Sequence, residues 1–234
     1  METVYTIALF ARNFFATIIP RAYCQILAAF QGQSYPDPIL VQKGFELISE
    51  PDPNNSEPPL FLIQGFHGYA RGFYDFIKNI GTAGYKGNIY LIYLPDNDSG
   101  PIQDEAARVA KIIDTALKER SGWLTANRDV RLLGHSKGGL VLGYFTEFLA
   151  KENNINVKKA ITIASPLQGT KTAWFGGSLA YKEMGWHHEL PMKVYNSMIA
   201  NEVTEYHSIG LEYDFIVLPD PETSILANLP EDRK

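Results

Sequence analysis

One cysteine, Cys24, is the whole cysteine content of the 234-residue sequence, so an internal disulfide and a metal site built on several thiolates are both excluded. Positive charge is also scarce: 21 Lys and Arg residues face 26 Asp and Glu residues, which gives a net charge of −5. Because nonspecific nucleic-acid binding needs clustered positive charge, we expect no nucleic-acid partner. The composition, with 45% hydrophobic and 20% charged residues, suits one large globular domain or at most two small ones.

Long hydrophobic runs are absent as well. Residues 4–30 are rich in apolar side chains, but charged residues such as Arg12 and Arg21 interrupt them before any run reaches the roughly 18 residues of a membrane span. The segment also lacks the basic start and the small-residue cleavage pattern of a secretory signal. We therefore predict an apolar, helical N-terminal extension over residues 1–35 and a cytoplasmic location. The alternative is an amphipathic segment that makes peripheral membrane contact through residues 1–30.

Two phosphate-binding patterns are missing. The sequence contains neither a Walker motif nor a Gly-x-Gly-x-x-Gly turn after a predicted strand, so we predict no dinucleotide cofactor. The adjacent histidines His187 and His188 are not spaced four residues apart on a helix, as the zinc-binding histidines of many hydrolases are. We therefore predict no metal site and no cofactor.

Short apolar runs alternate with helical patterns along residues 36–234. These runs are continuous, which is typical of strands buried on both faces of a parallel sheet. Between them, residues 101–117 begin with a proline followed by acidic residues, and residues 138–150 are apolar nearly all round, so both segments are predicted helices. We predict an α/β fold, with a mainly parallel sheet and helices on both faces. The predicted strands are 40–47, 60–63, 89–94, 130–133, 160–164 and 215–218.

The strongest chemical signal is the sequence Gly-His-Ser-Lys-Gly-Gly at residues 134–139. It follows the predicted strand 130–133 and opens the predicted helix 138–150, which is the context in which a Gly-x-Ser-x-Gly turn presents its serine. The glycines leave room for a close approach of strand and helix, and the helix N-terminus directs backbone N–H groups at an anion beside Ser136. The alternative is a glycine-rich turn without chemistry. We predict that Ser136 is a nucleophile.

Together with three further segments, this motif resembles the α/β-hydrolases, and among them the lipases and esterases. Residues 60–69 look like the strand and His-Gly turn that supply part of an oxyanion hole in this family. Residues 161–170 look like the strand and proline-containing loop that follow the helix after the serine. Residues 210–218, in which Asp214 precedes an apolar stretch, look like the loop of the catalytic acid. The four segments occur in the order that the family has.

The resemblance implies a role for each matching residue. Ser136 would attack the carbonyl of an ester, and the backbone N–H groups of Lys137 and Tyr69 would form the oxyanion hole. Asp214 would be the acid that orients the base, with Asp220 as the reserve candidate. The alternative for Asp214 is an ordinary surface carboxylate at the end of a strand.

The catalytic base does not follow the family's pattern. The family's order is serine, acid, histidine, but no histidine follows Asp214, and the twenty residues after it are about what one more helix and its connections would take. Three explanations stay open, in this order of preference. The chain is a fragment or a shortened product of an active hydrolase; it is a pseudoenzyme that keeps the fold without the base; or an earlier histidine serves, with His207 in reserve.

Residues 171–200 occupy the position at which lipases insert a lid, and aromatic and methionine side chains make the segment apolar. The alternative is ordinary helical packing on the core. A lid would favour a lipid or another hydrophobic acyl ester as the substrate. We therefore predict a serine hydrolase of carboxylic esters with a part in lipid metabolism, and the alternative is a catalytically impaired binding or scaffold protein.

Overall fold

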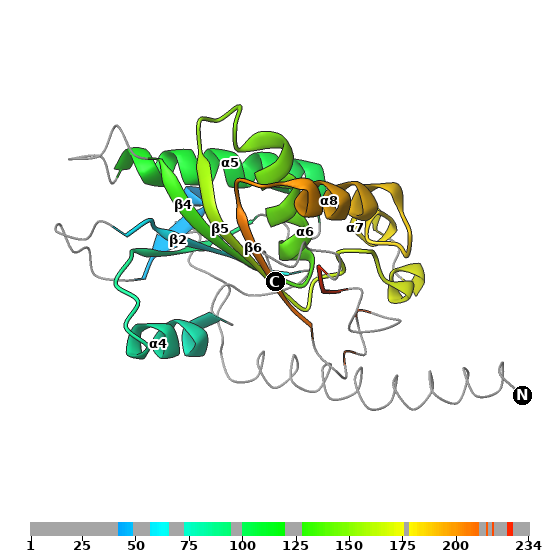
Figure 1. The fold of residues 1–234 in the computed structure, drawn as a ribbon, viewed down its shortest axis with the longest axis horizontal. Coiled ribbons are helices and arrows are strands. Elements are labelled where there is room, and N and C mark those ends of the chain that lie inside the picture. Colours follow the sequence, from blue (N-terminus) through cyan, green and yellow to red (C-terminus); the bar gives the residue numbers. More distant parts are fainter. Residues whose placement is uncertain are drawn as a thin grey trace, which may run out of the picture. The chain divides into compact units, whose positions relative to one another are not determined.

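Six strands form one mixed sheet in the computed structural model (Figure 1). The structure describes residues 42–48, 57–65, 73–94, 100–119, 128–175, 178–210, 214, 217 and 224–226, which all belong to one compact unit, Ile39–Lys234. The predicted N-terminal extension over residues 1–35 therefore lies outside the described residues. The strands are β1 (Phe45–Leu47), β2 (Leu60–Ile63), β3 (Ile89–Ile92), β4 (Asp129–His135), β5 (Asn156–Ile163) and β6 (Glu205–Ile209).

The order of the strands fixes where a site can form. Across the sheet they run β1-β3-β2-β4-β5-β6, and every neighbouring pair is parallel except β1 and β3. The chain moves from β2 outward to β3, crosses back to β4, and then moves outward the other way through β5 to β6. The direction of winding thus reverses between β2 and β4. In open α/β sheets, ligands bind beyond the carboxyl ends of the strands at such a reversal.

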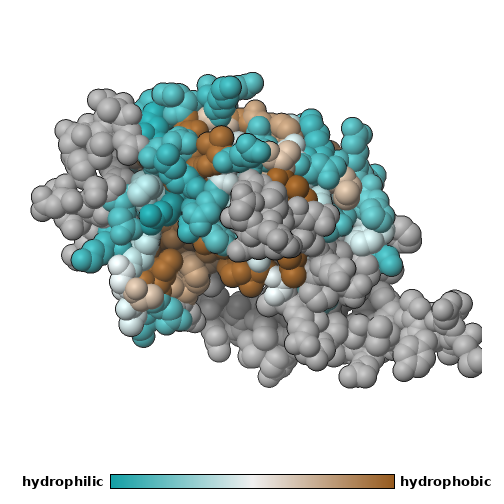
Figure 2. All heavy atoms as spheres, in the orientation of Figure 1, coloured by the Kyte–Doolittle hydropathy of each residue, from teal (hydrophilic) through white to brown (hydrophobic). Residues whose placement is uncertain are grey.

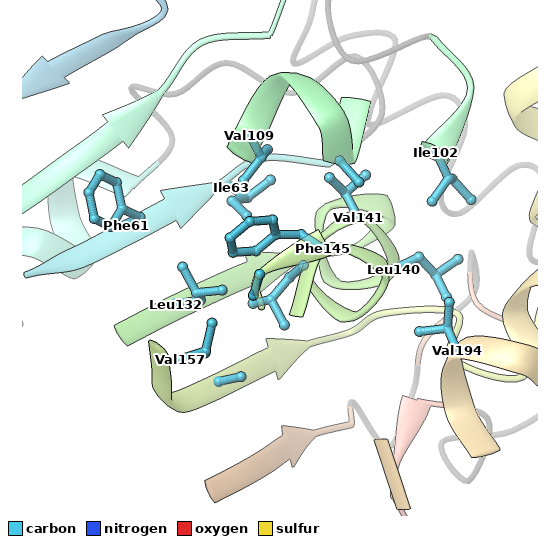
Figure 3. Packing of buried hydrophobic residues seen from close by; sticks show 14 of the residues in the cluster. Phe61, Ile63, Ile102, Val109, Leu132, Leu140, Val141, Phe145, Val157 and Val194 are labelled. Carbon is cyan, nitrogen blue, oxygen red and sulfur yellow. The ribbon is translucent and has the colours of Figure 1, made fainter. Parts of the chain in front are cut away.

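One face of the sheet is covered by the helices α5 (Ile102–Glu119), α6 (Lys137–Tyr144) and α8 (Glu189–Ala200), as Figure 1 shows. Figure 3 shows Phe145, which follows α6, among Ile63 and Leu132 of the sheet and Val109 of α5. All four side chains are fully buried. The predicted helix 101–117 is confirmed by α5, whose buried residues follow one face.

The other face of the sheet is covered by α4 (Tyr74–Thr82), which lies on the opposite side of the strands from α5, α6 and α8 in Figure 1. Ile77 and Ile80 of this helix pack against a buried cluster that includes Leu60 and Leu62 of β2. All four residues of β2 are buried, as are all four of β3, because these strands lie between two helical layers. The predicted fold, a mainly parallel sheet with helices on both faces, is confirmed.

Three short helical segments follow α6 and β5. The π-helix η4 (Phe145–Leu149) continues α6 directly, so the predicted helix 138–150 is present but changes its hydrogen-bond pattern halfway. The 3₁₀ helix η5 (Lys171–Phe175) and the helix α7 (Leu179–Glu183) follow β5.

The last strand differs from the prediction. The strand that pairs with β5 is β6, Glu205–Ile209, which the apolar-run criterion did not find because its residues alternate between buried and exposed. In the predicted strand 215–218, Val217 lies in a bend, and the other three residues lie outside the described part of the chain. At the opposite edge, β1 covers only the end of the predicted strand 40–47.

Helix α8 occupies the second half of the segment 171–200. Its residues Val194 and Met198 are fully buried against α6, where a Cβ on Gly143 would lie 2.6 Å from Val194 Cγ1. This side of α8 therefore packs on the core, as the alternative for the segment would have it. The lid over residues 171–200 stays a prediction.

Hydrophilic side chains cover most of the described surface on the face that Figure 2 shows, and hydrophobic ones form a band beside α4. Among the described residues, no helix combines the length and the hydrophobicity that crossing a membrane requires.

Candidate active site

The turn between β4 and α6 holds Ser136 in a strained backbone conformation. Its φ is 54° and its ψ is −129°, although it is not a glycine. Its N–H donates to the carbonyl of Ile163 on β5 at 2.9 Å, and its own carbonyl accepts from the N–H of Gly139 at 3.0 Å. Positive φ at a residue with a side chain costs about 1–3 kcal/mol and persists only where the surroundings impose it. Ser136 is partly exposed at this turn, just past the carboxyl end of β4.

The glycines of the motif are explained by close approaches of backbone to backbone. A Cβ on Gly138 would overlap the carbonyl oxygen of Gln64, just past the end of β2, and would lie 2.5 Å from that of Ile63. A Cβ on Gly134 would lie 2.5 Å from the carbonyl oxygen of Gly138. On the side of β2, a Cβ on Gly65 would lie 2.6 Å from Cβ of Ser136. The turn can therefore sit against β2 only because these positions carry no side chain.

The predicted oxyanion turn begins at this contact. Ile63 pairs with Gly134, and Gly65 is the last residue of the described stretch that contains β2. Tyr69, the predicted second oxyanion donor, lies outside the described residues. The first predicted donor, Lys137, opens α6, and the N–H groups in the first turn of a helix point out of its N-terminal end.

Asp214 follows the carboxyl end of β6. It is partly buried, and its Oδ1 accepts a hydrogen bond from the N–H of Val217 at 2.9 Å. Strand β6 ends with Ile209 paired to Ile163, whose carbonyl binds the Ser136 N–H. Asp214 and Ser136 thus follow the same edge of the sheet, two strands apart. Asp220, the reserve acid, lies outside the described residues.

His207, the reserve base, is not brought to the turn. It is exposed in the middle of β6, and its Nε2 lies 2.7 Å from Oε1 of Glu205. It pairs with Ile161, which pairs with Leu133, so it lies level with a residue three positions before Ser136. Two strand spacings across the sheet and three residues along it are each about 10 Å. The structure therefore gives His207 no contact with the serine.

The other histidines of the segment after β5 have structural partners. His188 is the N-cap of α8, where its Nδ1 accepts from the N–H of Leu190 at 3.3 Å. The ring of His187 lies 4.3 Å, centroid to centroid, from that of Trp186. Among the described residues, no group of three or more metal-binding side chains comes together.

A buried ion pair beside the turn was not predicted. The Nζ of Lys137 lies 2.6 Å from Oε1 of Glu105 on α5 and also donates to the carbonyl of Gly100. The two side chains are 0% and 3% exposed. Burial raises the pKa of the Glu105 carboxyl, while the ammonium of Lys137 acts in the opposite direction. The one sequence feature that could have indicated this ion pair is Glu105, a charged residue on the apolar face of the predicted helix 101–117.

The same end of α5 is held from a third element. Oε2 of Glu183, the last residue of α7, accepts the N–H of Ile102 at 2.7 Å. A carboxylate at this position satisfies one of the N–H groups that the first turn of a helix leaves without an intrahelical partner.

The architecture and the serine-bearing turn define the α/β-hydrolase fold: a parallel sheet with an antiparallel edge strand, helices on both faces, and a strained serine between a central strand and a buried helix. The chain has this fold, as the resemblance implied. Solved structures agree.

The comparison with solved structures includes two lipases and a phospholipase. The chain is similar to lipase B of Aspergillus fumigatus, with a TM-score of 0.61 and 18% identity over 78% of this chain and 44% of that one. The mature lipase BlEst2 of Bacillus licheniformis gives a TM-score of 0.53 and 19% identity over 70% of each chain. Phospholipase PlaB of Legionella pneumophila gives 0.51 and 16% over 64% of this chain and 38% of that one. The alignments thus span less than half of the Aspergillus and Legionella proteins. No protein-family model and no curated protein sequence matches the chain.

Proposed function

We propose that this protein is a serine hydrolase that cleaves carboxylic esters, with Ser136 as the nucleophile. The observation that carries the proposal is the positive φ of Ser136 at the point where the winding of the sheet reverses. A conformation that costs about 1–3 kcal/mol needs a compensating use. Presenting the serine hydroxyl above the carboxyl edge of the sheet is such a use. Core packing does not explain the conformation, because Ser136 is only partly buried.

The proposed reaction has two steps. Ser136 Oγ attacks the ester carbonyl carbon and passes its proton to a base, while the carbonyl oxygen becomes an oxyanion. As the intermediate collapses, the bond to the alcohol oxygen breaks and the alcohol leaves with the proton. Water then attacks the acyl-serine by the same route, which releases the carboxylic acid and restores the serine.

The N–H groups of Lys137 and Tyr69 are the proposed donors to the oxyanion, and Asp214 is the proposed acid. Losing one oxyanion donor typically costs about 3–4 kcal/mol of transition-state stabilisation. The base remains unassigned, because the described contact of His207 is with Glu205.

The substrate class is proposed from the solved structures to which the chain is similar. Two lipases and a phospholipase are among the similar structures, and all three names describe enzymes of lipid esters. We therefore propose a lipid or another acyl ester as the substrate.

Covalent labelling tests the nucleophile. A fluorophosphonate probe should add one phosphonyl group to the wild-type chain, detected by intact mass, and none to Ser136→Ala. Circular dichroism establishes that both proteins are folded. A folded wild-type chain that takes up no label, or an S136A variant labelled at the wild-type rate, refutes the assignment of Ser136.

A catalytically silent binding protein is the second candidate. It is favoured by the position of His207, which the sheet register keeps away from Ser136. Turnover of p-nitrophenyl esters of several chain lengths separates the two candidates. Turnover that is lost in S136A supports the hydrolase, whereas saturable ester binding without turnover supports the binding protein.

A further inference from the structure

The buried side chain of Lys137 connects the serine turn to the first turn of α5. We propose that Lys137 is a positioning residue: its ion pair with Glu105 holds the turn so that the backbone N–H of Lys137 itself faces the oxyanion. This inference rests on the proposed function, because it assigns a part in ester cleavage to a side chain that does not touch the substrate.

The Lys137 ammonium contacts both a side chain and a backbone carbonyl near the start of α5. Its Nζ bonds to Oε1 of Glu105 at 2.6 Å and to the carbonyl of Gly100, two residues before α5 begins. Both side chains of the ion pair are shielded from water, at 0% and 3% exposure. A lysine on the surface could exchange such partners for water, whereas a fully buried one has to keep them.

The anchor on α5 is itself fixed. The N–H of Glu105 donates to the carbonyl of Pro101 at 3.0 Å, which places Glu105 in the first turn of the helix. From the side of α7, the carboxylate of Glu183 binds the N–H of Ile102. Lys137 therefore binds the start of a helix that a separate contact, from Glu183, also holds. An ion pair to such a fixed point can set the position of the serine-bearing turn.

Stability alone is a weak reason for this ion pair. Removing two charges from water costs several kcal/mol, and a buried pair is often no more stable than hydrophobic residues of similar volume. Glu105 also leaves its second oxygen, Oε2, buried without a hydrogen-bond partner in the described part of the structure. An apolar pair would fill the same space without that loss. What the ion pair adds is a directed, short contact between two elements.

The turn needs such a constraint. Ser136 has positive φ, and the N–H of the next residue must lie within about 0.5 Å of its productive position for the oxyanion contact to keep its value. A Lys137 side chain fixed at its far end restrains the rotation of the peptide that carries this N–H.

The kinetics of fluorophosphonate labelling test the inference, because the phosphonyl oxygen of the probe enters the oxyanion hole. Lys137→Met keeps most of the side chain and removes the charge. We expect it to lower the maximal rate constant of labelling at least tenfold, while the probe concentration at half-maximal rate changes less than twofold. Lys118→Met is the matched control, because Lys118 forms an ion pair of the same 2.6 Å length with Asp114 on the same helix as Glu105, at an exposed position. It should label at the wild-type rate.

Further variants separate positioning from folding. Rates are compared at a temperature at which circular dichroism shows every variant folded, so a loss of stability alone leaves the maximal rate unchanged. If K137M does not fold, the double variant K137M/E105L replaces it, since it buries no unpaired charge, and it too should label at least tenfold more slowly. A maximal rate within twofold of wild type in the folded variant overturns the positioning role and leaves the proposed function standing. A folded wild-type chain without labelling overturns both.

Discussion

Three glycines offer a graded test of the packing around the serine turn. At Gly138 an added Cβ meets the carbonyl oxygens of Gln64 and Ile63, which are backbone atoms and cannot move aside. At Gly143 it meets Cγ1 of Val194 at 2.6 Å and Sδ of Met198 at 2.8 Å, which are side-chain atoms. At Gly81, an exposed position of α4, it meets nothing within 4 Å. Each position lies at the start of, or within, a helix and has no positive φ, so alanine brings a similar gain in helix propensity at each, and the differences between the variants report the space around the added methyl group.

The expected magnitudes follow from what each methyl group meets. Overpacking typically costs about 1–3 kcal/mol, and G138A should reach the upper end, about 3 kcal/mol, because the helix and the strand have to separate. G143A should cost about 1–2 kcal/mol, since the flexible methionine can move. G81A should be neutral or stabilising by up to about 1 kcal/mol, because alanine favours the helix.

Thermal and urea unfolding, followed by circular dichroism, measure these differences. For a domain of this size, 1 kcal/mol corresponds to a change of about 2–4 °C in Tm, so G138A should melt about 6–12 °C below wild type. G81A is the control for the effect of alanine itself. If G138A is as stable as G143A, the glycine at position 138 does not serve the close approach of α6 to β2.

Two further variants test a buried carboxyl and the proposed acid. Burial raises the pKa of Glu147, whose Oε1 accepts from Tyr206 and from Asn201, so folding favours its protonated form and the stability of the protein falls as pH rises through the raised pKa. Glu147→Gln should therefore lose less unfolding free energy than wild type between about pH 4 and pH 8 in urea titrations, and identical pH dependences would contradict this. Asp214→Asn keeps the oxygen that accepts the Val217 N–H, so its Tm should stay near wild type, while ester turnover should fall by as much as about 10⁴-fold. Unchanged turnover in D214N would identify Asp214 as an ordinary surface carboxylate.

The central strands could be predicted from the sequence because burial on both faces leaves a continuous apolar run. Strands β2 and β3 follow that rule, and their positions agree with the prediction. Strand β6 does not follow it: Tyr206 is buried, while Glu205 and His207 on either side are exposed. A five-residue segment of this kind carries too little hydrophobicity to be distinguished from a loop by sequence alone.

The serine turn was predictable because all of its requirements lie within six adjacent residues. The ion pair of Lys137 and Glu105 was not, because it joins residues 32 positions apart in the sequence. The lysine looked like a residue that only supplies a backbone N–H, and the glutamate looked like one of the acidic residues that open a helix. Only the packing of α5 beside α6 brings the two side chains together.

Six adjacent residues identify the turn, but they cannot hold it in place. The turn that carries the strained φ of Ser136 contacts three other elements: the Ser136 N–H binds β5, Gly138 lies against the end of β2, and the Lys137 side chain reaches α5. Strands β2 and β5 lie beside the turn because the sheet order places them on either side of β4. The same hexapeptide in another fold would lose all three contacts and would relax to a conformation of lower energy. The chemistry proposed for Ser136 therefore depends as much on the strand order as on the motif.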